Sequence, residues 1–318
     1  MANNLNFTRD TLEKVFRLAD ILGYLNANPL TAQTLALKGG TAINLTVFDL
    51  PRLSLDIDLD YACNNSREEM LAQREQITSD IKTYMSTQGY ALSHRSRERH
   101  SLDSFVFTYH NLGGMNDNIK IEINYSLRAH LFDPQKRAII TQAVETDRSI
   151  LSVVPMEIYA AKINALLSRS APRDLYDVHG MVHFGLFGED DKDLLRRSTV
   201  FYTAISQEQI PQEYSLKRID SITNQKIRSE LLPVLQKGEH VPLADMKAAV
   251  REYIADLMQP TENERAFLQA FDRKEYHPEF LFSDDVLERI RNHPMALWKM
   301  QEHQHSELAV FPRRGLSQ

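Results

Sequence analysis

The sequence predicts an α+β fold in which strands and helices are mixed at first and helices predominate later. Apolar and polar residues alternate in three segments, which are predicted strands at 55–61, 104–109 and 119–125. Helical spacing of apolar or charged residues appears at 8–25 and 67–88. After Pro155 the strand signal fades and long helical stretches follow. This segregation predicts two domains, 1–150 and a mainly helical 151–318.

The first predicted helix, 8–25, buries one apolar stripe. Its apolar residues are spaced for one helix face: Leu12, Val15, Phe16, Ala19 and Leu22. Thr8 or Asp10 can cap its start, and Asn28-Pro29 breaks the chain after it. The following segment begins apolar, tightens at Gly39-Gly40 and becomes apolar again, which indicates a short strand or helix end, a turn and a helix.

The strictest alternation in the chain lies in residues 55–61. A strand here buries four apolar side chains and places three acidic ones on its other face: Asp56, Asp58 and Asp60. The strand 119–125 alternates in the same way and places Glu122 on the same side as Lys120. Further along, 157–169 and the segment that follows it are predicted to be helices.

The composition is that of an ordinary globular protein. Of 318 residues, 42% are hydrophobic and 25% charged, and 37 basic against 43 acidic side chains give a net charge of −6. A nucleic-acid coat protein is therefore disfavoured, although a local basic patch is compatible with this balance. The single Cys63 excludes a disulfide framework and a cysteine-based zinc site. Without a long apolar run or a signal-like N-terminus, we expect a cytoplasmic protein without a membrane span.

Three carboxylates on one strand face repel one another unless a cation lies between them. Asp-x-Asp on a strand directs hard oxygen ligands at one point, which suits Mg²⁺ or Mn²⁺. Gly39, Gly40 and Thr41 precede this strand, and a glycine pair before a helix allows backbone N–H groups to approach a phosphate. Taken singly, a Gly-Gly-Thr is mostly a turn and an Asp-x-Asp mostly a solvated face; the two together, in this order, favour a phosphate and metal site.

Two blocks of the sequence resemble a known family. Residues 38–61, KGGTAINL followed by RLSLDIDLDY, are similar to the first motif of nucleotidyltransferases related to DNA polymerase β, and more closely to the AbiEii/AbiGii (MenT-like) toxins. The Arg-x-Ser-x-Asp-x-Asp form of that family is reproduced by Arg52, Ser54, Asp56 and Asp58. Its downstream helix lysine and Arg-Asp-x-x-Asp segment are matched by Lys162, Arg169, Arg173, Asp174 and Asp177. The matched blocks cover about residues 36–180.

The resemblance implies a nucleotidyltransferase-type mixed sheet with flanking helices, followed by a helical half that completes the active site. It implies transfer of a nucleoside monophosphate from Mg²⁺-NTP to RNA, in known members to the 3′ end of tRNA, by a toxin with a separately encoded antitoxin. Asp56 and Asp58 would hold the metal ions and Lys162 would face the triphosphate. Strand alternation alone, without the family motif, makes Glu122 a candidate third metal ligand or the group that takes up the proton of the RNA hydroxyl.

Other charged residues are given weaker roles. Arg52 and Lys38 are candidate phosphate contacts or ordinary surface charges. Asp177 is a catalytic candidate that positions Lys162 or Arg173 through a charge-assisted pair or acts at the acceptor, and Asp174 is a candidate helix N-cap.

Two further signals are less specific. His179 and His183 share a helix face but lack the glutamate and third ligand of a zinc site. The basic runs at 94–100 and Arg196-Arg197 are typical of solvated segments, and they would also suit a phosphate backbone.

Two alternative functions remain open from the sequence. One is a transferase of the same fold that acts on a protein or a small molecule. The other is a relic that binds a nucleotide or a partner without turnover, which the retention of mutually repelling carboxylates disfavours. A metallohydrolase is more distant, because it would require the histidines to bind metal.

Overall fold

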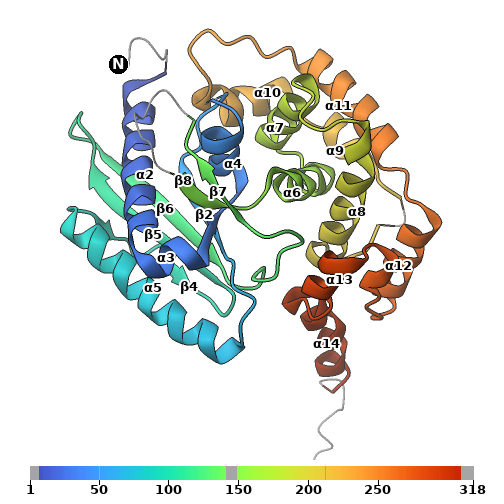
Figure 1. The fold of residues 1–318 in the computed structure, drawn as a ribbon. Helices are drawn as coiled ribbons and strands as arrows, with labels where there is room; N and C mark the ends of the chain where they lie inside the picture. Colours follow the sequence, from blue (N-terminus) through green and yellow to red (C-terminus); the bar gives the residue numbers. More distant parts are fainter. Residues whose placement is uncertain (1–6, 50, 141–148, 212, 309–318) are drawn as a thin grey trace, which may run out of the picture.

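The computed structural model of the chain describes residues 7–49, 51–140, 149–211 and 213–308, with side chains described up to residue 301. Strands occur only before residue 153 in this part of the chain, and the long segment after it is helical (Figure 1). The first part contains four helices, a one-turn π-helix and eight strands: α2 (Arg9–Ala27), α3 (Pro29–Thr34), β1 (Leu35–Leu37), α4 (Gly39–Ala42), η1 (Ile43–Val47), β2 (Asp56–Tyr61), α5 (Arg67–Thr87), β3 (Ala91–Leu92), β4 (Arg97–Glu98), β5 (Leu102–His110), β6 (Asn116–Asn124), β7 (Gln135–Ala138) and β8 (Ser149–Ser152).

The described strands form one mixed sheet in the order β3-β5-β6-β2-β1-β8-β7, with β4 paired to β5. The central strand β2 runs parallel to β6 and antiparallel to β1, and β1 in turn runs parallel to β8. The expected α+β class and the mixed sheet with flanking helices are confirmed.

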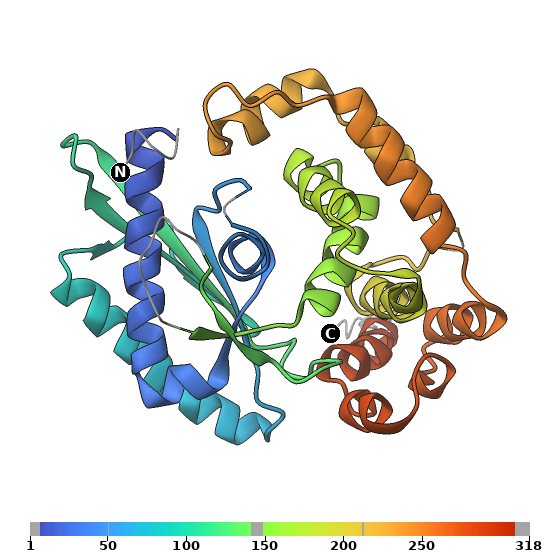
Figure 2. The ribbon, with the colours of Figure 1, turned by 45° about the horizontal axis from the view of Figure 1, so that its top comes forward.

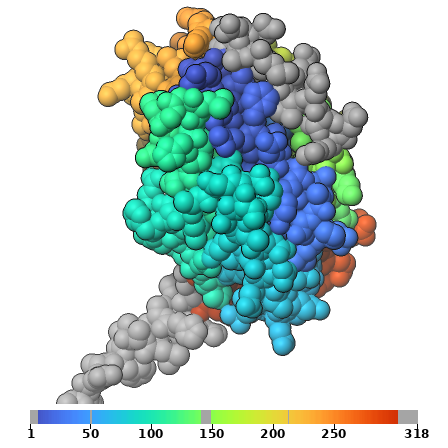
Figure 3. All heavy atoms as spheres, turned by 90° about the vertical axis from the view of Figure 1, so that its left-hand side faces the viewer, coloured from blue at the N-terminus to red at the C-terminus, as the bar shows by residue number. Residues whose placement is uncertain are grey.

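Helices α2 and α5 cover one face of the sheet (Figures 1 and 3). This covered face carries apolar residues of β2, β5 and β6 that are fully buried, among them Ile57, Phe105 and Ile121. The predicted cap of α2 is also present, because Thr8 accepts a hydrogen bond from the N–H of Thr11. Ser66 and Glu69 form a capping box that starts α5.

The remaining helices lie beside the sheet as a second body (Figure 2). Their bounds are α6 (Pro155–Ser168), α7 (Pro172–His183), α8 (Glu189–Ser206), α9 (Lys217–Asp220), α10 (Asn224–Lys226), η2 (Ile227–Leu231), η3 (Leu232–Val234), α11 (Leu243–Leu257), α12 (Glu262–Asp272), η4 (Pro278–Phe280), α13 (Asp284–Ile290) and α14 (Pro294–Leu308). A buried carboxylate ties this body to the sheet: Glu157 of α6 accepts hydrogen bonds from His130, which follows β6, and from Tyr202 of α8. The charge of Glu157 is thus compensated at the junction.

The sheet is larger than the sequence predicted. Strands β5 and β6 are each nine residues long and β6 begins three residues earlier than expected. Strands β3, β4, β7 and β8 have two to four residues each, which is too short for alternation to be recognised. The segment after Gly39-Gly40 is helical as expected, but one α-turn passes into the π-helix η1.

Candidate active site

The carboxylates of β2 face a polar cavity between the sheet and the helical body. Asp56 lies opposite Lys120 on β6, and Asp58 lies opposite Glu122. The cavity measures about 350 Å³ and is lined by residues of the sheet, of α6 and α7 and of η2: Gly40, Arg52, Ser54, Asp56, Asp58, Glu122, Lys162, Arg169, Ala171, Arg173, Asp174 and Glu230. The structure therefore brings together the two sequence blocks that lie a hundred residues apart.

The two cavity aspartates are held where ionisation is unfavourable. Burial raises the pKa of Asp56, and Glu122 adds to this, while Lys120 acts in the opposite direction. Burial likewise raises the pKa of Asp58, and the like charges of Asp56 and Glu122 raise it further. A cation bound between these groups would remove the repulsion, so their placement favours a cation-binding role.

The glycine pair is fixed by the space around it. Gly39 has φ +65°, a left-handed conformation that side chains disfavour, and a Cβ there would lie 3.1 Å from an oxygen of Asp58. A Cβ on Gly40 would lie 2.5 Å from a guanidinium nitrogen of Arg52. Only glycine lets the start of α4 approach Asp58 and Arg52 this closely.

The side chains of Thr41 and Asp60 are buried and hydrogen-bonded next to the cavity. Thr41 is buried, and its hydroxyl donates to the carbonyl of Asp56 and lies 2.8 Å from the Ser54 hydroxyl. Its side chain therefore braces β2, and the phosphate contact expected at Gly39, Gly40 and Thr41 stays a prediction that concerns backbone N–H groups. Asp60 is on the same face of β2 but is buried and paired with Lys38, two residues further along the strand than Asp58.

Lys162 lies at the centre of a buried ion network behind the aspartates. Its ammonium is 3.0 Å from Asp174 and 2.9 Å from Asp177. Asp177 also accepts two hydrogen bonds of 2.7 Å from Arg52, whose side chain is only 3% exposed. Although burial opposes ionisation, Arg52 and Lys162 hold the pKa of Asp177 below its usual value. The network fixes the segment before β2 to α6 and α7.

The predicted partners of this network are partly corrected by the structure. Asp177 pairs with Lys162 as expected, but its second partner is Arg52 and not Arg173. Asp174 is within the first turn of α7, whose N-cap is Ala171, so Asp174 is not the cap residue. It pairs instead with Lys162 and Arg169.

A comparison with protein-family models matches residues 20–275 to the nucleotidyl transferase AbiEii toxin of type IV toxin–antitoxin systems. The chain belongs to the AbiEii nucleotidyltransferase toxin family. The match extends well beyond residues 36–180, which carry the sequence resemblance, and into the helical body. A comparison with curated proteins finds no significant match.

The fold of this AbiEii-family chain is similar to that of MenT4, a nucleotidyltransferase toxin from Mycobacterium tuberculosis. The two share 18% sequence identity with a TM-score of 0.60, over 91% of this chain and 93% of MenT4. At that identity the likeness establishes the fold. No helix in the described part of the chain is long and apolar enough to cross a bilayer.

Two arginines of this AbiEii-family site were not included among the predicted site residues. Arg169 has an exposed side chain at the cavity, and Arg173 is half-buried there and donates to the carbonyl of Glu230 at 2.9 Å. The sequence signal for both was present in the Arg-Asp-x-x-Asp segment. Glu230 carries no such signal, because η2 reaches the cavity only through tertiary packing.

The donor set of the AbiEii-family cavity suits a hard divalent cation. Among the described residues no three acidic, histidine or cysteine side chains are arranged as a ready-made metal site. Glu122 is 2.8 Å from Lys120, so its carboxylate is already paired. Asp56 and Asp58 remain as two oxygen donors on one face, which is the number of carboxylates that Mg²⁺ commonly takes together with substrate phosphates.

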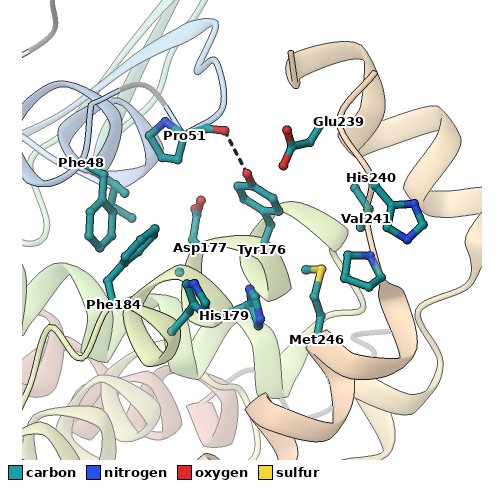
Figure 4. A pocket seen from close by; sticks show the side chains of 14 residues that line it. Phe48, Pro51, Tyr176, Asp177, His179, Phe184, Glu239, His240, Val241 and Met246 are labelled. Atoms are coloured by element: carbon teal, nitrogen blue, oxygen red, sulfur yellow. Dashed lines mark hydrogen bonds between the residues drawn. The ribbon is translucent and has the colours of Figure 1, made fainter. Parts of the chain in front are cut away.

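A second cavity of about 230 Å³ is lined by residues of η1, α7 and α11, with Asp177 of α7 among them (Figure 4). Phe48 and Phe184 lie at one end of it, and the Tyr176 hydroxyl donates to the carbonyl of Pro51. His179 and His183 also line it as stacked rings, 5.7 Å apart. The described residues that line this second cavity are mostly apolar and aromatic and include no lysine or arginine, so the cavity with the β2 carboxylates is the better candidate for phosphate chemistry.

Proposed function

We propose that this AbiEii-family chain transfers a nucleoside monophosphate from Mg²⁺-NTP to an RNA acceptor, with the 3′ end of tRNA as the favoured acceptor. It would act in the cytoplasm as a toxin restrained by a separately encoded antitoxin. The observation that carries this proposal is that two partly desolvated aspartates, Asp56 and Asp58, line the same cavity as Lys162, Arg169 and Arg173. Carboxylates suit the metal, and the cations suit the phosphates that accompany it.

The residues around the cavity divide into three roles in this proposal. Asp56 and Asp58 would hold Mg²⁺ or Mn²⁺, which when bound neutralises phosphate charge and orients the attacking and leaving oxygens. Arg169 and Arg173 would bind the triphosphate, because each presents a guanidinium at the cavity. Lys162 supplies positive charge close to the reacting phosphate, held in place by Asp174 and Asp177.

Glu122 would accept the proton of the acceptor hydroxyl or complete the metal site. It lies on the strand next to Asp58, at the matching register position. Either role requires a carboxylate in its ionised form, and this is also the form that pairs with Lys120.

The helical part, 151–318, completes this site in the proposal and forms a separate domain from 1–150. It supplies Lys162, Arg169 and Arg173 to a cavity whose metal-binding carboxylates come from the sheet. An NTP held by both parts would therefore bridge them.

The acceptor class is tested by the distribution of label. Purified protein is incubated with each α-labelled NTP, Mg²⁺ and a bacterial lysate, and RNA, protein and small-molecule fractions are separated. We expect label at the size of tRNA with the wild type and none with Asp56→Ala. Label confined to protein or to small molecules would keep the transferase and reject the RNA acceptor. Nucleotide binding without label in any fraction would show a non-catalytic relic.

A further inference from the structure

One face of strands β5 and β6 is open and begins at the cavity. Alternate residues of both strands are only partly buried, and they lie opposite the face covered by α2 and α5: Leu102, Ser104, Val106 and Thr108 on β5, and Asn118, Lys120, Glu122 and Asn124 on β6. Their neighbours on the covered face, such as Phe105 and Ile121, are fully buried. The open face is therefore a mostly polar surface, with Leu102 and Val106 as its apolar members, and it adjoins the cavity carboxylates.

The strand register places a basic residue in the same row as Asp58. Asp58 pairs with Glu122, Glu122 with Ser104, and Ser104 with Arg97 of β4. Directly paired residues of neighbouring strands project from the same face of a sheet. Strands lie about 4.8 Å apart, so the three steps from Asp58 to Arg97 span about 14 Å.

Contacts on the other face confirm the direction of these side chains. Glu98 pairs with Lys82 of α5, and Asp103, which is paired with Glu98 in the ladder, binds Arg74 of α5. Because Glu98 points toward α5, Arg97 before it in β4 projects toward the open face, and Arg99 follows in the turn to β5.

The arginines of this turn are available to a ligand. Arg95, Arg97 and Arg99 are exposed, and none has a carboxylate partner within the described part of the chain. One guanidinium nitrogen of Arg97 donates to the carbonyls of His94 and Ser96, at 2.7 and 2.8 Å, which holds the side chain at the surface.

The second basic run of the sequence is not available in this way. Arg196 is paired with Glu264 and Asp193, and Arg197 is paired with Asp193. The structure thus separates two basic runs that the sequence could not distinguish.

We propose that the open face between Asp58 and Arg97 is the docking track for the single-stranded 3′ segment of the RNA acceptor. The proposal rests on the proposed function and adds the path of the substrate. A stacked strand advances about 3.4 Å per nucleotide, so 14 Å holds about four nucleotides upstream of the reacting 3′ hydroxyl. Arg97 and Arg99 would contact the backbone phosphates there, and polar side chains of β5 and β6 would line the path.

The test is the kinetics of transfer to total bacterial tRNA by the full-length double variant R97E/R99E. Arg265→Glu is the matched control, because Arg265 is an exposed arginine of α12 without an ion pair in the described structure. We expect the KM for tRNA to rise at least tenfold in R97E/R99E and to change less than twofold in Arg265→Glu. The affinity for Mg²⁺-NTP should remain within twofold of the wild type in both. Because the double variant removes two cations that would bind phosphates of a single strand, the slope of log affinity against log salt should become shallower by about 1.4.

The outcomes separate this inference from the proposed function. Transfer to tRNA with an unchanged KM and salt slope in R97E/R99E would overturn the docking track and leave the proposed function intact. Loss of transfer to a protein acceptor, with tRNA kinetics unchanged, would assign the face to an acidic protein and also overturn the inference. No transfer to RNA by the wild type would reject the proposed function and the docking track together.

Discussion

Substitution of Asp177 by asparagine removes one charge from the buried network while keeping the shape of the side chain. Asp177 is 1% exposed and has two cationic partners, Arg52 and Lys162. Lys162 keeps Asp174 as a partner in the variant, but Arg52, which is 3% exposed, loses its carboxylate. The variant therefore leaves a guanidinium buried without its counter-charge.

Breaking a buried pair in this way costs about 3–5 kcal/mol. For a chain of 318 residues, where 1 kcal/mol shifts Tm by about 1.5 °C, the loss corresponds to a fall of roughly 5–7 °C. The pH dependence of this stabilisation follows from the lowered pKa of Asp177 in the folded state. The contribution of Asp177 to stability is present above the unfolded pKa of about 3.9 and is lost as pH falls through the lower folded pKa. The difference between wild type and variant should therefore be full at pH 7.

The assay is thermal unfolding followed by circular dichroism, with Asp220→Asn as the control. Asp220 also pairs with one arginine, Arg251 at 2.5 Å, but both side chains are exposed. The control should change stability by less than about 1 kcal/mol. A double variant, Arg52→Met with Asp177→Leu, removes both charges and should recover part of the loss. If Asp177→Asn unfolds within 2 °C of the wild type, the network does not hold the segment before β2 to α7.

The carboxylate cavity gives three more testable expectations. Gly39→Ala should lose at least tenfold in transfer activity, because its Cβ would lie 3.1 Å from an oxygen of Asp58. The control is Gly89→Ala: Gly89 also has a positive φ, but the space around it is open, so this variant should keep full activity. Equal activity of the two variants would show that the approach to Asp58 is unimportant. As pH is lowered, activity should fall with a midpoint above the ordinary aspartate pKa of about 3.9, because the pKa values of Asp56 and Asp58 are raised. Since Mg²⁺ competes with protons for these carboxylates, more Mg²⁺ should lower this midpoint. A pH–rate midpoint that does not respond to Mg²⁺ would contradict this. Without divalent cations at pH 7, Asp58→Asn should raise Tm, because a carboxylate with a raised folded pKa opposes folding when it is ionised; a lower Tm in EDTA would refute it.

The parts of the fold that the sequence predicted are those with long, regular patterns. Strand β2 alternates without interruption, and its alternation correctly separated Ile57, which is buried, from Asp58, which faces the cavity. The edge strands, such as β4 with two exposed residues, offer no such pattern and depend on pairing with β5. Tertiary contact, and not local propensity, makes them strands.

The site was predictable in its residue types but not in its contacts. The aspartates and Lys162 are marked by motifs, whereas the pairing of Arg52 with Asp177 joins positions 125 residues apart. Thr41 is marked by its place after two glycines, where a side chain can face either a bound phosphate or the sheet, and its hydroxyl is buried and donates to the carbonyl of Asp56. Only the packing of α4 against β2 decides between these two roles.

The most direct test of the central claim is a paired measurement of transfer and pyrophosphate release by the wild type and Asp58→Asn. Asparagine keeps the size of the side chain but removes the charge that would hold Mg²⁺. We predict one pyrophosphate for each labelled acceptor in the wild type and a loss of at least a hundredfold in both products in the variant, which remains folded. Undiminished label and pyrophosphate in Asp58→Asn would show that the carboxylate cavity is not where the reaction occurs.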